Sequence, residues 1–89
     1  MANKRNLKHD INLICSDLFA ECLAIALYSK EEKEEHIEDL LQSILNTHAD
    51  FIRRVSHPEP GMPQKEYFKA LTEDFENHVN ELIDQICNL

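Results

Sequence analysis

The stretch from Ile11 to Tyr28 limits what this chain can fold into more than any other part of the sequence. It is strongly apolar and carries only four clearly polar side chains. Placed at ~100° per residue, as in an α-helix, its apolar side chains cover an arc of roughly 220°, against roughly 100° for an ordinary surface helix. A helix of this kind needs cover on two sides, so we expect it to be the central helix. The arc contains Ile11, Ile14, Cys15, Leu18, Phe19, Cys22, Leu23, Ile25, Ala26 and Leu27.

Length and composition favour one small helical domain. A chain of 89 residues buries only about 60 to 65% of the surface that it exposes when unfolded, so its core is thin. Hydrophobic residues make up 43% of the sequence, there is one glycine, and all three prolines lie between residues 58 and 63. The turn residues that an all-β chain needs are therefore missing, and we predict an ordered all-α protein.

The charge of the chain bears on its partners. A formal net charge of -8 argues against sequence-independent nucleic-acid binding, which needs lysines and arginines to neutralise phosphates, and against anionic membranes. We interpret the one basic cluster, Lys4, Arg5 and Lys8, as an ordinary N-terminus. No stretch has the ~18 to 20 uninterrupted apolar residues of a membrane span, and the first ten residues lack the apolar part of a secretory signal. We therefore expect a cytoplasmic protein that contacts no membrane and no nucleic acid.

Helix start and stop signals divide the chain into predicted helices at residues 7–28, 30–56 and 63–88, with a loop at 57–62. Asn6 can cap the first helix, and residues 29–32 read Ser-Lys-Glu-Glu, the form of a capping box. Pro58 disfavours helix in the residue before it, so the second helix must end near Ser56 or His57. Pro63 suits the first position of the third helix, where its missing N–H costs nothing.

Short connections make consecutive helices antiparallel neighbours. The sequence therefore predicts a single domain, residues 1–89, with the fold of an antiparallel up-down-up three-helix bundle. The apolar arc of the first helix is wider than two neighbours of this length must cover, and Leu13 lies outside even that arc. We therefore expect two bundles to pair as a symmetric six-helix dimer, which buries the excess.

Metal and cofactor chemistry finds little support in the residue spacing. No Glu-x-x-His pair is present for a di-iron bundle, and the cysteines lack the C-x₂₋₄-C spacing of a zinc site. Cys15 and Cys22 are seven residues apart on one helix face, about 10 Å along the axis, which is too far for a disulfide. We interpret them, with Cys87, as reduced thiols that face the core, and His48 as a neutral core imidazole. We expect no cofactor and no metal, and the alternative is a ligand-binding or metal-binding bundle centred on His48, Cys15 and Cys22.

Catalysis of hydrolysis is weakly indicated at one place. Glycine is almost absent and there is no G-x-S-x-G, so no loop is available to form an oxyanion hole. Arg53, Arg54 and His57 resemble the R-x₄₋₆-H element of small helical ribonucleases of the HEPN class, in which the arginine and histidine serve phosphodiester cleavage. The interval here, Arg53-x₃-His57, is one residue short. A small helical ribonuclease or toxin-system component is therefore an alternative function.

Two segments carry a resemblance to a known family. ICSDLFAEC at residues 14–22 and RVSHPEPGM at residues 54–62 are similar to a family of small all-helical bacterial proteins known as hypothetical open reading frames. The resemblance spans the whole chain and implies a compact helical domain encoded alone. It implies no activity, no ligand and no residue role.

No set of residues has the spacing of a catalytic site, so we predict a non-enzymatic interaction module. We expect it to be a homodimer that presents a surface to a protein partner, which the sequence does not identify. Three prolines stiffen the segment HPEPGMP, so a partner that binds it pays less ordering entropy. Arginine, tyrosine and methionine, the types enriched at interfaces, cluster beside it. The simpler alternative is that the prolines end and begin helices while the arginines complement a helix dipole. The predicted contact residues are Arg53, Arg54, His57, Glu59, Met62 and Tyr67.

Overall fold

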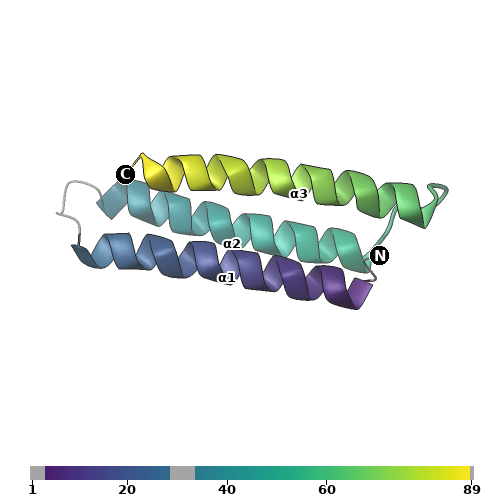
Figure 1. The fold of residues 1–89 in the computed structure, drawn as a ribbon, viewed down its shortest axis with the longest axis horizontal. Helices are drawn as coiled ribbons and strands as arrows, with labels where there is room; N and C mark the ends of the chain where they lie inside the picture. Colours follow the sequence, from purple (N-terminus) through teal and green to yellow (C-terminus); the bar gives the residue numbers. More distant parts are fainter. Residues whose placement is uncertain (1–3, 29–33, 89) are drawn as a thin grey trace.

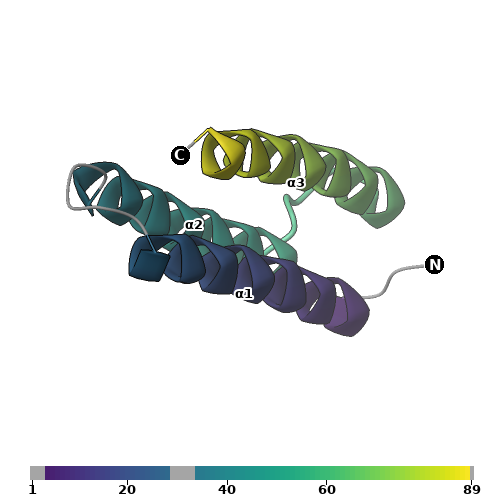
Figure 2. The same ribbon diagram turned by 60° about the vertical axis from the view of Figure 1, so that its left-hand side comes forward.

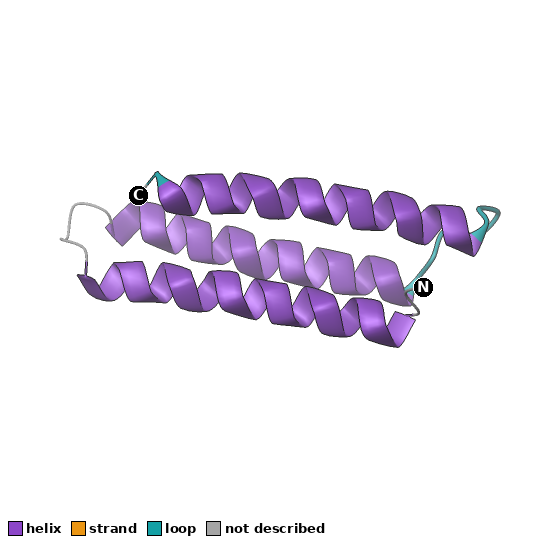
Figure 3. Ribbon diagram, in the orientation of Figure 1, coloured by secondary structure: helices purple, strands orange, loops and turns teal. Residues whose placement is uncertain are grey.

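The computed structural model describes residues 4–28 and 34–88, and within these ranges the regular structure is entirely helical (Figure 3). The helices are α1 (Lys4–Tyr28), α2 (Glu34–Ser56) and α3 (Gln64–Cys87). Consecutive helices run in opposite directions and form a rod with extents of 49 × 18 × 17 Å (Figure 1). The prediction of an all-α chain with three helices is confirmed.

The start of α1 differs from the sequence prediction. α1 already includes Lys4, so the predicted start at Leu7 with Asn6 as the cap is wrong. Lysine and arginine favour helix, and the buried side chain of Leu7 anchors this extra turn to the core. The predicted capping box at residues 29–32 lies outside the described residues, and α2 is described from Glu34 onward.

The core is a single cluster to which all three helices contribute. α1 supplies residues at spacings of three and four, which places them on one face. Phe51 of α2 and Phe75 of α3 meet edge to face, with ring centroids 5.1 Å apart. The arrangement is uneven, because α1 packs closely on α2 while α3 lies mainly on α2 and touches α1 little (Figure 2). The buried residues are Leu7, Ile11, Cys15, Leu18, Cys22, Ile37, Leu40, Ile44, Phe51, Val55, Leu71, Phe75, Leu82 and Ile86.

The connection between α2 and α3 is a tight turn. The N–H of Met62 donates to the carbonyl of Glu59 at 3.4 Å, and Gly61 has a φ of +89°. Proline at the second turn position and a glycine with positive φ at the third are the requirements of a type II turn. Pro63 then precedes α3 as its N-cap, with φ -57° and ψ 134°, rather than being the first helical residue that the sequence predicted.

We predict that Gly61→Ala lowers the free energy of unfolding by about 1 to 3 kcal/mol, the usual cost of an L-residue held in a sparsely populated backbone region. An added Cβ meets nothing within 4 Å, so the loss would come from backbone strain and not from a clash. Urea unfolding monitored by circular dichroism measures the effect. Glu59→Ala, at an exposed position of the same turn, is the control. Equal stability of the two variants would contradict the type II turn.

Candidate interaction surfaces

α1 has a second apolar face that the bundle leaves uncovered. The side chains of Leu13, Leu23 and Leu27 are 54%, 42% and 83% exposed, and Ser16 and Ala20 between them are exposed as well. These five residues, which we call the outer stripe, follow one another at spacings of three and four. That is the repeat with which a helix packs along a partner helix. α1 therefore carries one apolar face inside the bundle and another outside it.

A groove of about 320 Å³ lies beside the outer stripe, between α1 and α2. One of its α2 residues, Leu45, is 47% exposed. Ser16, Ala20 and Leu23 belong both to the outer stripe and to the groove, so the two form one continuous surface. The lining residues are Cys15, Ser16, Phe19, Ala20 and Leu23 from α1 and Ile44, Leu45 and His48 from α2.

His48 lies at the edge of the core and not inside it, in contrast to the sequence interpretation. Its side chain is half-buried, and its Nε2–H donates to Oδ1 of Asn12 on α1 at 2.5 Å. The groove brings His48 together with Cys15, whereas Cys22 does not line it. Within residues 4–28 and 34–88, no group of three or more His, Cys, Asp or Glu side chains is placed to hold a metal ion.

Arg54, one of the predicted contact residues, links α2 to α3. Its Nη1 lies 2.6 Å from Oδ2 of Asp74, and its Nη2 lies 3.0 Å from Oδ2 of Asp50. Its guanidinium also sits 4.7 Å from the centroid of the Phe51 ring, a favourable place for a cation. These contacts give Arg54 a structural role in the bundle.

Tyr67 has a structural role as well. Its hydroxyl donates to the backbone carbonyl of Arg54 at 2.9 Å, which satisfies one of the carbonyls that the last turn of α2 leaves without a helical partner. Arg53 pairs with Asp50 at 2.5 Å, but its side chain stays 70% exposed. Of the six predicted contact residues, four are therefore exposed on the described surface: Arg53, His57, Glu59 and Met62.

The ribonuclease hypothesis needs arginines that can meet a phosphate. Both arginines already face carboxylates of this chain, at Asp50 and Asp74. His57 is one helical turn from Arg53, and its backbone N–H donates to the Arg53 carbonyl at 3.0 Å. No contact between these side chains assembles a site for phosphodiester cleavage among the interactions of the described residues, so the structure adds no support to this alternative.

Sequence reasoning missed the full extent of the polar cluster around Arg54. Nε2 of His78 lies 3.7 Å from Oδ1 of Asp74, and the His78 ring meets Phe51 edge to face at 5.3 Å. The spacing of Asp74 and His78, four residues, was a visible signal that they share a face. Their partners on α2 depend on which faces of the two helices meet, and no local pattern encodes that.

The three cysteines are free thiols in two different environments. Cys15 and Cys22 are buried, as predicted, whereas Cys87 near the end of α3 is exposed, so its interpretation as a core thiol is wrong. Burial disfavours the charged thiolate and raises the pKa of both Cys15 and Cys22 above the ordinary value of 9.0.

α1 also has the length and composition of a helix that crosses a membrane, with a mean hydropathy of 1.6 over 18 residues. The core helix of a soluble protein and an N-terminal signal sequence share these properties, so this is a weak indication, and the absence of membrane contact stays a prediction. Only 22% of this stretch is buried in the bundle. The uncovered part of α1 is therefore large relative to its buried part.

Comparison with known proteins adds no relative. No family model, no curated protein and no solved structure matches this chain. The resemblance to small all-helical bacterial proteins therefore stays an expectation, and function has to be argued from the surfaces described above.

We predict that Tyr67→Phe lowers the free energy of unfolding by about 1 kcal/mol, because it removes the hydrogen bond to the Arg54 carbonyl and keeps the ring. The control is Tyr28→Phe, at a side chain that is 89% exposed, which should leave stability unchanged. Urea unfolding of the two variants beside the wild type gives the comparison. Wild-type stability for Tyr67→Phe would mean that this hydrogen bond does not help to hold α3 on α2.

We predict that stability falls as the pH rises past about 9, partly through Cys15 and Cys22. Their folded pKa values are raised, so above 9.0 the unfolded chain loses protons that the folded chain keeps, and unfolding becomes more favourable. The double variant Cys15→Ala/Cys22→Ala should lose less unfolding free energy than the wild type between pH 8 and pH 10. Cys87→Ala, which changes an exposed thiol, should keep the wild-type slope. Identical slopes for all three proteins would show that the buried thiols do not contribute.

Proposed function

We propose that the protein is a non-enzymatic helical interaction module that works as a homodimer and presents a surface to a protein partner. The observation that carries the proposal is the outer stripe of α1 with the adjoining groove, an apolar surface that the fold builds and leaves open. Leu13, Leu23 and Leu27 are 54%, 42% and 83% exposed. Removing apolar surface from water is favourable by about 25 cal/mol per Å², so association through this face would be stabilising.

The location of this surface also supports an interaction role. Single exposed leucines are normal on a protein surface, but contiguous apolar patches mark places of contact. The outer stripe extends along α1 from Leu13 to Leu27, about 21 Å at 1.5 Å per residue. Its repeat matches the seam of helix-helix packing, and so a helix is the natural partner element.

The partner-binding surface of the dimer is proposed at the turn between α2 and α3. Arg53, His57, Glu59 and Met62 are exposed there beside the stiff turn, whereas Arg54 and Tyr67 hold the two helices together. Binding of an outside protein at this place would not compete with association through α1, because its residues come from the end of α2 and the turn, and none of them belongs to the outer stripe or the groove.

We predict a solution mass of twice the 10.4 kDa of one chain in sedimentation equilibrium at micromolar concentration. Leu23→Glu should weaken the dimer roughly a hundredfold or more, because a desolvated unpaired carboxylate costs several kcal/mol and each 1.4 kcal/mol is a factor of ten. Ile83→Glu on α3 is the matched control, since Ile83 is 43% exposed and Leu23 is 42% exposed. Both variants should keep the wild-type melting behaviour of the isolated bundle.

A wild-type protein that stays monomeric up to millimolar concentration would overturn the homodimer. Equal effects of Leu23→Glu and Ile83→Glu would show that the contact is not specific to α1.

A further inference from the structure

We propose that a polar groove between α2 and α3 binds a small organic cation that carries hydroxyl groups, of the chemical class of amino alcohols and amino sugars. The groove has a volume of about 270 Å³ and shares no residue with the outer stripe of α1 or with the turn. A ligand here is therefore separate from the proposed interaction with proteins. The polar residues that line the groove are Ser43, Asn46 and Thr47 from α2 and His78, Glu81 and Gln85 from α3.

Helical spacing brings these side chains together. The α2 residues lie within little more than one turn, and the α3 residues recur at spacings of three and four, which places them on one face. Leu82 lies among them and is only 5% exposed, so it forms an apolar floor beneath polar walls. Pockets for drug-sized ligands measure roughly 300 to 1,000 Å³, so a groove just below that range suits a smaller molecule.

The two hydroxyls of the groove are open to a ligand. Elsewhere in the bundle, Ser56 and Thr72 donate to the backbone carbonyl four residues earlier, at 3.0 Å and 2.8 Å. Ser43 and Thr47 make no such bond in the described part of the chain. Their hydroxyls therefore keep both a donor and acceptor sites for a molecule in the groove.

Two other groups are already oriented by the bundle. The Nε2 of His78 faces Asp74 at 3.7 Å and the ring meets Phe51 edge to face, which leaves Nδ1 as the ring nitrogen that a ligand can meet. The Oδ1 of Asn46 accepts a hydrogen bond from Gln42 at 3.0 Å, so its amide NH₂ remains as a donor. Side chains that are oriented in advance lose less entropy when a ligand binds.

The half of the bundle that contains the groove lacks basic side chains other than histidine. Lysine and arginine are absent from residues 9–28, 34–52 and 70–88. The described lysines and arginines all lie toward the other end of the rod, at the start of α1, the end of α2 and the start of α3 (Figure 1). The undescribed segment 29–33 contains two lysines and two glutamates, which add no net charge. An anionic ligand would therefore find no cation in the groove, whereas the negative field attracts a cation.

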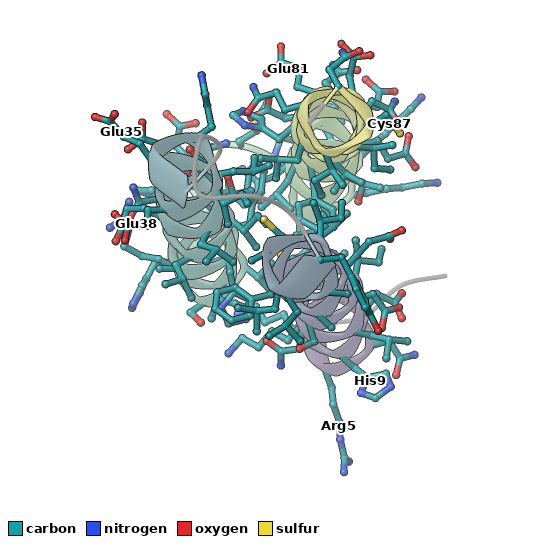
Figure 4. The ribbon with its side chains drawn as sticks, turned by 90° about the vertical axis from the view of Figure 1, so that its left-hand side faces the viewer. Arg5, His9, Glu35, Glu38, Glu81 and Cys87 are labelled. Carbon is teal, nitrogen blue, oxygen red and sulfur yellow. The ribbon has the colours of Figure 1, made fainter. Side chains whose placement is uncertain are left out.

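Glu81 supplies the carboxylate for that cation. It lines the groove, and no basic side chain of residues 4–28 and 34–88 pairs with it. Figure 4 shows Glu81 on the side of α3 away from α1, with Glu35 and Glu38 on the outside of α2 at the same end of the bundle. A hydrogen bond from an ammonium group to a carboxylate is roughly twice as strong as one between neutral groups. Hydroxyls of the ligand donate and accept, as do the hydroxyls and amides of the walls.

Titration with three related sugars, followed by proton–nitrogen correlation NMR at neutral pH, tests the site. D-Glucosamine, D-glucose and D-gluconate are all rich in hydroxyls and are positive, neutral and negative. Glucosamine should shift the side-chain amide signals of Asn46 and Gln85 together with backbone signals around the groove. Glucose should bind about tenfold more weakly, because it lacks the charge-assisted hydrogen bond, and gluconate should cause no shift.

Variants separate the groove from the general charge of the chain. Glu81→Gln keeps the shape of the side chain and should weaken glucosamine binding about tenfold. Glu76→Gln is the matched control, since Glu76 is an exposed glutamate of α3 that does not line the groove, and it should bind as the wild type does. Thr47→Val, which replaces a hydroxyl by a methyl group, should weaken binding of both glucosamine and glucose. Circular dichroism confirms that each variant is folded.

Three outcomes would overturn the proposal. Glucosamine that causes no shift up to its solubility limit would show that the groove binds no ligand of this class. Equal binding of the three sugars would show that charge does not select the ligand. Equal losses in Glu81→Gln and Glu76→Gln would show a general attraction of cations to an acidic surface. None of these results bears on the homodimer, which sedimentation measures separately.

Discussion

The structure depends on one mismatch: α1 carries more apolar surface than α2 and α3 cover. α1 carries apolar side chains on two sides, and in the described part of the chain its neighbours are α2 and α3, of which α3 lies mainly on α2. The side of α1 with Ile11, Leu18 and Cys22 becomes the core. The other side keeps Leu13 and Leu27 in water. Within residues 4–28 and 34–88 no further element covers them, so the free energy of burying that surface is available to something outside the described bundle.

The contact between α2 and α3 is of another kind. Beside the apolar rings of Phe51 and Phe75, it contains an arginine held between two carboxylates and a tyrosine hydroxyl bonded to a helix carbonyl. Partly exposed ion pairs contribute little on their own, typically up to 1 kcal/mol, because solvent screens them. The geometry of these contacts nevertheless favours one register of α3 on α2. The contacts also engage Arg54 and Tyr67, whose residue types alone suggest a binding surface.

The proposed binding at the turn and the proposed self-association through α1 would use different parts of the molecule. The turn depends on Gly61 for its shape, and Arg53, His57 and Met62 are exposed around it. The outer stripe depends only on the face of one helix. A protein that pairs through one surface can therefore offer two copies of the other, which raises the apparent affinity for a partner with repeated sites.

The sequence by itself determined the helices, the end of α2 before Pro58 and the surplus of apolar surface on the first helix, because helical periodicity and proline chemistry are local properties. Only the tertiary structure decided which part of the apolar arc is used inside. Ile14 and Leu23 belong to the arc as much as Ile11 does, yet α2 and α3 cover only the last of these well. The same holds for Arg54, whose role depends on the long-range partner Asp74, twenty residues away. The angle and offset at which helices pack result from the fit of all their side chains together, and no single segment of the sequence specifies them.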